Sequence, residues 1–257
     1  MKSLEESVVA AMDGDEPGIF PFLPYILQDF WEIGSSPSEM IGLIEKHSRN
    51  YPELKVLDLG CGKGAVSVRI AEKLGCRCWG FDGVPAFIEE AIRRSSEYGA
   101  AHLCCFETAD IRTKIDSLPL FDIIILGAVG PVFGDYEQTL EKLGKCLKKE
   151  GIILIDDAYI PDNSSFSHPA LWKKREVWTQ IRRAGMEVME EVPAEKSECR
   201  GEEYDRELNR ITVRCAELLK KYPDKRELLE NYVKKQKAEY EVLEEKIVST
   251  VIVIKAK

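Results

Sequence analysis

The stretch VLDLGCGKGAV carries the clearest chemical signal in the sequence. An apolar run reaches Asp58, and Gly60, Gly62 and Gly64 then follow at alternate positions. A turn without side chains lets a ligand approach bare backbone amides at the positive end of the helix that follows. The spacing also fits the dinucleotide fingerprint, whereas the ending of a phosphate-binding P-loop is missing. These residues predict a small ligand at the turn.

Two further acids follow the next two apolar runs. Asp82 ends the run CRCWGFD, and Asp110 follows the run LCCFETA. A carboxylate in the first place can accept both ribose hydroxyls of a nucleotide cofactor, and one in the second can accept from the exocyclic amine of adenine. Asp58 would repel a pyrophosphate, but it suits a ligand with an ammonium and a sulfonium. Each acid alone is equally consistent with a solvated loop residue. The three together favour a ligand with an adenosyl group and a sulfonium.

Alternating strand and helix patterns must position these residues. Strands are predicted over 54–59, 76–82, 103–109, 121–127 and 151–156, and helices over 64–74, 85–97 and 135–149. Continuous apolar strands separated by helices are typical of a parallel sheet that is covered on both faces. The sequence therefore predicts an α/β fold.

The second half of the chain has a different pattern. A helix is predicted over 170–184, a strand over 186–192, two helices between 202 and 245, and a strand at the C-terminus. Tyr222 and Pro223 separate the two long helices. Asp224, with Glu227 three residues later, is typical of a capping box at the start of the second one.

The stretches VLDLGCGKG, GFDGV, TADI and FDIIILG together resemble the class I S-adenosylmethionine-dependent methyltransferase family. The resemblance covers about residues 40–160, with a weaker match through 186–192 and 246–257. It implies a Rossmann-like methyltransferase fold, with a doubly wound, seven-stranded, mostly parallel sheet. An antiparallel hairpin of 186–192 with 248–256 would close that sheet. A nicotinamide dehydrogenase, the rival interpretation of the glycine turn, needs neither this hairpin nor Asp110.

The resemblance also implies where the cofactor, S-adenosyl-L-methionine, would bind. In that family the glycine turn holds the methionine part, and acids after the second and third strands hold ribose and the adenine amine. The residue after the fourth strand offers its carbonyl to the methionine end. Carried over by position, cofactor binding is expected at Asp58, Gly60, Cys61, Gly62, Gly64, Asp82, Gly83, Ala109, Asp110, Ile111 and Gly127.

The methyl acceptor is expected beyond the carboxyl ends of the strands, where ligands of open α/β sheets bind. Asp157, Tyr159 and His168 are candidates to touch the acceptor or to act as a general base. Each has an alternative role in capping a helix, binding backbone or facing water. Catechol-type members of the family hold Mg²⁺ with an acid after the fourth strand. Gly127 stands there, so no metal site is expected.

Two additions to the common core bear on specificity. The expected organisation is a single methyltransferase domain, 1–257, with an N-terminal cap segment, 1–36, a cofactor-binding core, 37–160, and a helical insertion, 200–245, before the last strand. In the resembling small-molecule enzymes such additions fold over the cofactor. Tyr25 and Trp31 are therefore expected to line the acceptor pocket. In the alternative interpretation these aromatic residues only pack on the sheet.

Composition narrows the class of protein. The 257 residues carry a net charge of -9, which disfavours nucleic acid as a partner. Apolar stretches fall far short of the roughly 20 residues of a membrane span, and the N-terminus lacks a secretory pattern. The eight cysteines form no CxxC pair and mostly lie in apolar patterns, as in reduced cytosolic proteins. We expect a cytoplasmic protein, and the sequence does not determine its oligomeric state.

The predicted function is methylation of a small molecule with S-adenosyl-L-methionine. An RNA or protein methyltransferase is one alternative, although the balanced charges of the helical insertion do not form a nucleic-acid footprint. A cofactor-binding protein without catalysis is a second alternative, because no general base is evident from the sequence. A nicotinamide dehydrogenase is the third.

Overall fold

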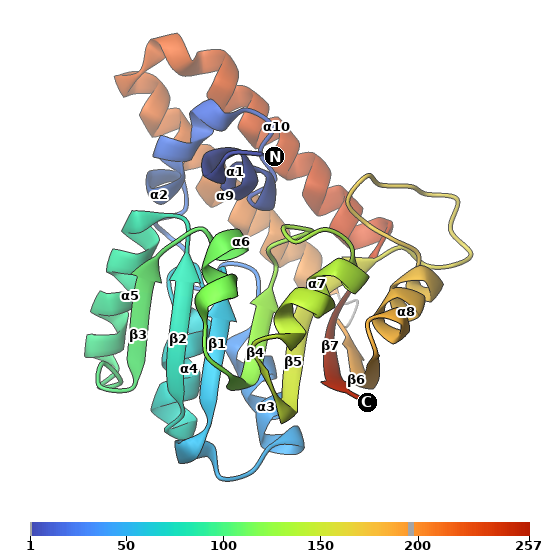
Figure 1. Cartoon of the computed structure of the whole chain (residues 1–257). Helices are drawn as coiled ribbons and strands as arrows, with labels where there is room; N and C mark the ends of the chain where they lie inside the picture. The colour runs from blue at the N-terminus through green and yellow to red at the C-terminus, as the bar shows by residue number, and fades with distance from the viewer. Residues whose placement is uncertain (1, 195–197) are drawn as a thin grey trace.

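A seven-stranded sheet forms the centre of the protein, whose computed structural model describes residues 2–194 and 198–257. The strands lie in the order β3-β2-β1-β4-β5-β7-β6 (Figure 1). Their bounds are β1 Lys55–Leu59, β2 Arg77–Asp82, β3 Cys104–Thr108, β4 Phe121–Gly127, β5 Leu147–Tyr159, β6 Met186–Pro193 and β7 Val248–Ala256. β7 runs antiparallel to its neighbours, β5 and β6, and the other pairings are parallel among the described strands. The predicted doubly wound sheet and its closing hairpin are confirmed.

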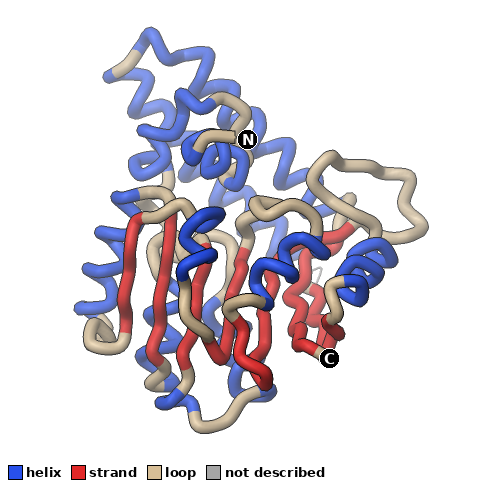
Figure 2. The backbone as a smooth tube through the Cα atoms, in the orientation of Figure 1, coloured by secondary structure: helices blue, strands red, loops and turns tan. Residues whose placement is uncertain are grey.

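Helices cover both faces of this sheet (Figure 2). The α-helices are α1 Leu4–Ala11, α2 Leu23–Ile26, α3 Pro37–His47, α4 Ala65–Leu74, α5 Pro85–Glu97, α6 Ile111–Lys114, α7 Tyr136–Gly144, α8 Lys174–Arg183, α9 Glu198–Lys221 and α10 Arg226–Glu245. Short 3₁₀ turns are η1 Pro17–Phe22, η2 Tyr51–Glu53, η3 Ile115–Ser117 and η4 Pro223–Lys225. The helices predicted over 64–74 and 85–97 are confirmed as α4 and α5. None of the described helices is long and apolar enough to cross a bilayer.

Successive residues of each central strand enter two different cores. Leu57 of β1 and Ile124 of β4 belong to a core that α7 and α8 complete. Val56 and Ile123, their neighbours in sequence, belong to a core that α3 and α4 complete. Strand side chains alternate between the faces of a sheet, and both faces here are buried. The strands therefore appear in the sequence as continuous apolar runs.

The N-terminal segment and the helical insertion pack together into a cap, formed by α1, η1, α2, α9 and α10. Ile19 and Leu23 share a buried cluster with Ile211 and Leu229. The cap stands beyond the carboxyl ends of the parallel strands (Figure 1). Segments at opposite ends of the sequence thus lie together over the sheet edge where ligands of open α/β folds bind.

The helix predicted over 135–149 ends early, because β5 begins sooner than the sequence indicates. α7 ends at Gly144, and β5 begins at Leu147, which pairs with Phe121 at the start of β4. The amide of Phe121 donates to the carbonyl of Cys146 at 2.7 Å. This tertiary pairing overrides the helix propensity of the lysine-rich segment. The prediction for residues 145–149 is therefore wrong.

Two predicted helix starts are also wrong. The helix predicted over 170–184 begins at Lys174, because the carbonyl of Trp172 accepts from the amide of Ile160 at 2.9 Å and holds the chain against β5. The capping box at Asp224 does not form. Asp224 lies inside the turn η4, and α10 begins after it without a side-chain cap.

Candidate functional site

The glycine turn joins β1 to α4 through left-handed backbone. Gly60, Gly62 and Gly64 have φ of 75°, 52° and 73°, which glycine adopts without steric cost. The amides of Gly60 and Cys61 donate to the carbonyl of Phe81 at 2.8 and 3.1 Å, which docks the turn on β2. A Cβ on Gly62 would meet no atom within 4 Å. The backbone of Gly62 therefore borders open space.

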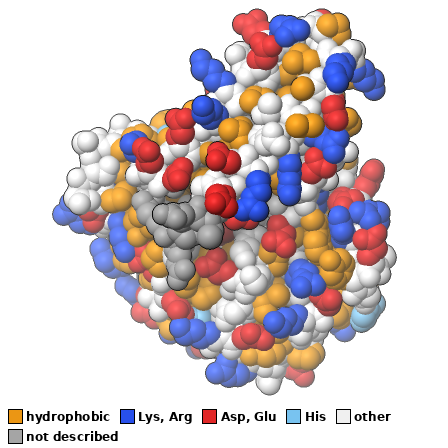
Figure 3. Space-filling model, turned by 180° about the vertical axis from the view of Figure 1, so that it is seen from behind, with side chains coloured by type: hydrophobic (Ala, Val, Ile, Leu, Met, Phe, Trp, Pro, Cys, Tyr) orange, Lys and Arg blue, Asp and Glu red, His pale blue; other side chains and the backbone are white. Residues whose placement is uncertain are grey.

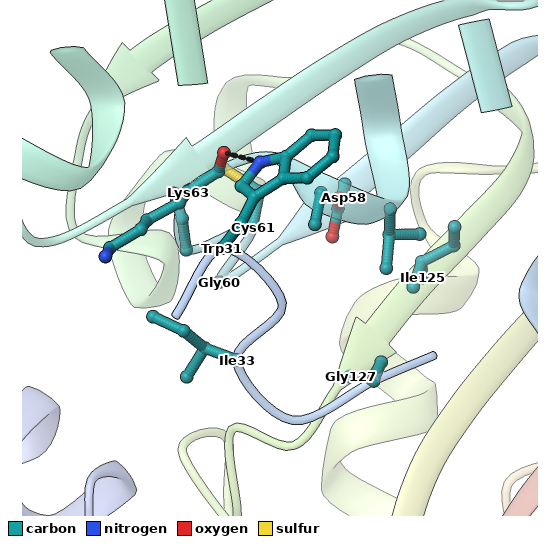
Figure 4. A pocket seen from close by; sticks show the side chains of 12 residues that line it. Trp31, Ile33, Asp58, Gly60, Cys61, Lys63, Ile125 and Gly127 are labelled. Atoms are coloured by element: carbon teal, nitrogen blue, oxygen red, sulfur yellow. Dashed lines mark hydrogen bonds between the residues drawn. The ribbon is translucent and has the colours of Figure 1, made fainter. Parts of the chain in front are cut away.

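A pocket opens at this turn (Figure 4). Its lining residues are Trp31, Ile33, Ser35, Asp58, Gly60, Cys61, Gly62, Lys63, Ala65, Val66, Ile125 and Gly127. The turn, the end of β1 and the end of β4 form one side. The other side is residues 27–35 of the N-terminal segment, which we call the strap. Trp31 projects from the strap toward the turn (Figure 4).

Asp58 places a carboxylate at the base of the pocket. It is 4% exposed, and its Oδ2 accepts from the Ser67 hydroxyl at 2.6 Å. Burial raises the pKa of Asp58 to about 6, the Ser67 hydrogen bond opposes that rise, and the nearby Asp82 adds to it. Over the described residues no lysine or arginine forms a salt bridge with Asp58. A buried carboxylate of this kind favours a cationic ligand.

Asp82 connects the end of β2 to the glycine turn. Its Oδ2 accepts from the Gly62 amide at 2.9 Å, and its Oδ1 accepts from the Val84 amide at 2.8 Å. Burial raises the pKa of Asp82 to about 6, and the backbone hydrogen bonds counteract part of the rise. A carboxylate accepts about four hydrogen bonds. Both oxygens of Asp82 therefore retain capacity for ligand hydroxyls.

Asp110 has a partner that the sequence did not reveal. It caps α6, and the Arg112 guanidinium beside it holds the pKa of Asp110 below its usual value. Arg112 Nη1 also donates to the carbonyl of Lys2 and to Ser7 Oγ, both at 2.8 Å. These contacts fix α1 beside the end of β3.

Helix α1 also lies over the end of β2. A Cβ on Gly83 would lie 2.8 Å from Val8 Cγ2 and 2.9 Å from Leu4 Cδ1. Gly83 is thus the position at which β2 accommodates the apolar side of α1. The N-terminal helix covers the region where the sequence predicted ribose and adenine.

Known proteins share this fold. A family model described as a methyltransferase domain matches residues 50–246. The chain belongs to the class I S-adenosylmethionine-dependent methyltransferase family. Among solved structures, it resembles a SAM-dependent methyltransferase from Geobacter sulfurreducens in complex with S-adenosyl-L-homocysteine. The TM-score is 0.75 and the identity 20%, over 92% of this chain and 98% of the other.

Curated relatives match this chain over part of their length. Phosphoethanolamine N-methyltransferase 1 of Zea mays is 36% identical over 106 residues, which are 41% of this chain and 21% of that protein. Ribosomal protein L11 methyltransferase of Thermosipho africanus is 28% identical over 154 residues, which are 58% of this chain and 56% of that protein. The matched regions thus span about a fifth of the first relative's length and little more than half of the second's.

The structure brings several predicted cofactor residues of the methyltransferase together. The pocket at the turn is lined by Asp58, Gly60, Cys61, Gly62 and Gly127, and also by Trp31, which the sequence predicted for the acceptor pocket. Gly64 lies beneath it, where a Cβ would meet Ala91 and Phe106. Ala109 and Ile111 flank Asp110, and the Ala109 amide donates to the Asp82 carbonyl at 2.9 Å. Asp82, at the end of β2, is thus in direct contact with the loop that follows β3.

Tyr25 is not among the residues that line the pocket at the turn, and its expected place in the acceptor pocket stays a prediction. It is 41% exposed, and its hydroxyl donates to Glu217 Oε2 at 2.8 Å. The aromatic ring therefore lies between two parts of the cap. Trp31 does reach the pocket, but it covers the glycine turn, where its Nε1 donates to the carbonyl of Lys63 at 3.1 Å.

The three candidate acceptor residues have different hydrogen-bond partners. Asp157 Oδ2 accepts from the Tyr136 hydroxyl at 2.9 Å, and burial raises the pKa of Asp157. The Tyr159 hydroxyl donates to Glu191 Oε1 at 2.7 Å. His168 Nδ1 accepts from the amide of Ala170 within the loop before α8. All three side chains thus bond to the protein itself, and Asp157 is the half-buried carboxylate among them.

Sequence reasoning missed Lys63, Ser35 and Tyr136. Lys63 Nζ donates to the carbonyls of Leu27 and Phe30, both at 2.6 Å, and so ties the strap to the turn. A lysine between two glycines of a ligand-binding turn was the available signal for Lys63. Ser35 and Tyr136 have no comparable signal, because their roles depend on contacts far away in the sequence. No cluster of potential metal ligands occurs within residues 2–194 and 198–257.

Proposed function

We propose that this protein transfers the methyl group of S-adenosyl-L-methionine to a small-molecule acceptor. One observation carries the proposal. Two buried carboxylates, Asp58 and Asp82, converge on a glycine turn whose Gly62 borders open space, and neither forms a salt bridge within the described part of the chain. The first suits the cofactor's ammonium, and the second suits its ribose hydroxyls.

The chain's residues would hold the cofactor in a fixed orientation. Asp58 and the carbonyl of Gly127 would bind the methionine end, the glycine turn would lie beneath it, and Asp82 would accept from ribose. Asp110, with the Ile111 amide at the start of α6, would face adenine. The bound cofactor supplies an electrophilic methyl group. The protein has to align the acceptor with it and exclude water, which by itself lowers the barrier to an in-line displacement.

Asp157 is the base that we propose for acceptors that start protonated. It lies at the carboxyl end of β5, and burial raises its pKa toward the range in which a carboxylate removes protons efficiently. Tyr136 donates to one oxygen and the Ala158 amide donates to the other at 2.8 Å. Remaining lone pairs on the carboxylate can take the acceptor's proton.

The cap supports a small acceptor over a macromolecular one. α1, the strap and α9 stand over the site (Figure 1) and leave the narrow pocket of Figure 4 beside the turn. On the face of the molecule in Figure 3, acidic and basic side chains intermingle over the cap and the sheet domain. Neither feature favours a charged polymer. The relative from Zea mays is named for a small amine substrate, and the one from Thermosipho africanus for a ribosomal protein.

Calorimetry and label transfer test this function. We expect S-adenosylmethionine and S-adenosylhomocysteine to bind and NAD to leave the heat signal unchanged. The protein, incubated with methyl-labelled cofactor and a metabolite extract, should place label in small molecules. Label transferred to protein or RNA in a parallel incubation with a whole-cell extract would reverse the choice of acceptor class. Binding without any transfer would show a silent cofactor-binding protein.

A further inference from the structure

Two buried side-chain hydroxyls lack a hydrogen-bond partner in the described part of the chain, Ser35 Oγ and Thr250 Oγ1. Thr250 lies within the closing hairpin, between Asp157 of β5 and Pro193 of β6. Ser35 belongs to the strap, is 6% exposed and lines the pocket at the glycine turn. A buried hydroxyl without a partner is unfavourable. Its position in the pocket suggests that a ligand supplies the partner.

Small residues on both sides bring the strap against the end of β4. Gly34 has φ of 84°, and a Cβ there would lie 2.5 Å from the Cβ of Ala128. A Cβ on Gly127 would collide with the Ser35 hydroxyl. Larger side chains at these positions would push the strap away, since packed interiors leave no slack. The close contact therefore holds the Ser35 hydroxyl directly beside Gly127.

The strap is fixed on both sides of Ser35. Toward the C-terminus, Ser36 caps α3 by accepting from the Glu39 amide at 3.4 Å. Toward the N-terminus, Lys63 holds the carbonyls of Leu27 and Phe30. The Ser35 hydroxyl is thus held in place before any ligand arrives, as an efficient binding group must be.

The other groups of the pocket indicate which ligand atom this hydroxyl faces. Asp58 supplies a carboxylate, and the end of β4 at Gly127 supplies backbone. The Lys63 ammonium is engaged by the strap carbonyls and points away from Asp58 (Figure 4), so it does not neutralise the acid. A carboxylate, a carbonyl and a hydroxyl oxygen provide three acceptors, and an ammonium group has three donors.

We propose that Ser35 Oγ binds the α-ammonium group of the cofactor, together with Asp58 and the Gly127 carbonyl. The inference rests on the proposed function, because it names a further residue of the same site. The strap is then part of the cofactor site as well as its cover.

The test compares Ser35→Ala with the wild type for three ligands. S-adenosylhomocysteine has both the ammonium and the carboxylate, decarboxylated S-adenosylmethionine has only the ammonium, and 5′-methylthioadenosine has neither. We expect Ser35→Ala to weaken the first two by about tenfold, the loss of one charge-assisted hydrogen bond. Affinity for 5′-methylthioadenosine should stay unchanged. The melting temperature of the unliganded variant should equal or exceed that of the wild type, because an unpaired hydroxyl is removed.

Thr250→Val is the matched control, since it removes the other unpaired buried hydroxyl. It should leave all three affinities unchanged. Equal affinity of Ser35→Ala and wild type for S-adenosylhomocysteine would overturn the inference, and so would an equal loss for 5′-methylthioadenosine. A loss confined to S-adenosylhomocysteine would assign Ser35 to the carboxylate and contradict the ammonium role. If the wild type binds none of the three, the proposed function itself fails.

Discussion

Asp58 and Asp82 show how burial changes the chemistry of a single residue. Asp82 accepts from the backbone of the glycine turn, Asp58 lies in the strand that leads into that turn, and burial raises the pKa of each to about 6. The charge of both groups therefore changes with pH in a range where exposed carboxylates stay ionised. Cofactor affinity and the free energy of unfolding should therefore both depend on pH in that range.

Cofactor affinity should fall as the pH drops from 7 to 5. A protonated Asp58 loses its attraction for an ammonium, and each carboxylate that must be ionised contributes about a tenfold loss per pH unit below its pKa. Calorimetry of S-adenosylhomocysteine at pH 7, 6 and 5 measures the effect. Asp58→Asn should bind weakly at pH 7 and show a shallower pH dependence. A flat wild-type profile would mean that neither acid contacts the ligand.

Stability of the unliganded protein should move in the opposite direction. The pKa of Asp58 and of Asp82 rises from 3.8 to about 6 on folding, so the folded state binds more protons between these values. The favourable contribution is present below pH 3.8 and is lost as the pH rises through about 6. Wild type should therefore gain stability between pH 7 and 5 relative to Asp58→Asn, as measured by urea titration. Parallel curves for the two proteins would contradict the burial argument.

Asp157→Asn should lower kcat by about 10²–10⁴, the usual contribution of a general base, and leave cofactor affinity unchanged. Tyr136→Phe removes a hydrogen bond that lowers the pKa of Asp157. That variant should move the acidic limb of the kcat profile to higher pH. Steady-state kinetics across pH with calorimetry of the cofactor separates these effects. An unchanged kcat for Asp157→Asn would remove it from the proposed mechanism.

At the scale of elements, the connection from β1 to α4 combines left-handed backbone with access for a ligand. Three left-handed glycines let the turn dock on β2 while Gly62 faces open space. Gly99 offers a matched comparison, with φ of 67° and likewise nothing within 4 Å of a built Cβ. It follows α5 and is not among the residues that line the pocket.

Gly62→Ala and Gly99→Ala should therefore destabilise the fold alike but affect binding differently. Each places an alanine in left-handed backbone, at about 1–2 kcal/mol. Only the Gly62 methyl would enter the ligand's space, so we expect at least a tenfold loss of cofactor affinity there and none for Gly99→Ala. Thermal melts and calorimetry give the two readouts. Equal affinities would place the cofactor away from the turn.

At the scale of the whole molecule, the cap joins the N-terminal segment to the helical insertion. Arg214 of α9 donates through Nε and Nη2 to both oxygens of Asp29 in the strap, at 2.7 Å each. Arg214 also donates to Glu217, which accepts from Tyr25. The insertion thus holds the strap over the pocket, and loosening that contact should affect the residence of a bound cofactor.

Arg214→Gln should speed cofactor release several-fold and change the melting temperature little, because exposed ion pairs contribute little to stability. Arg226→Gln is the control, since Arg226 pairs with Glu230 inside α10 and leaves the strap untouched. Stopped-flow displacement of S-adenosylhomocysteine measures the release rates. Identical rates for both variants would show that the strap does not gate the site.

The sequence by itself determined the order of strands and helices, the glycine turn and the three acids that follow successive strands. These features are local, because apolar periodicity, glycine spacing and strand ends are written in adjacent residues. Prediction from the sequence failed where pairing between distant segments overrides local helix propensity. At 145–149, pairing with β4 ends the predicted helix and begins β5.

Only the tertiary structure decided how the site is enclosed. Lys63 holds the strap, Ser35 lies beside Gly127, and Leu4 of α1 packs on Gly83. None of these contacts has a signature in neighbouring residues, since each forms only when chain segments far apart in sequence pack against one another. The burial that raises the pKa of Asp58 likewise arises from the surrounding fold and cannot be deduced from the residue's type.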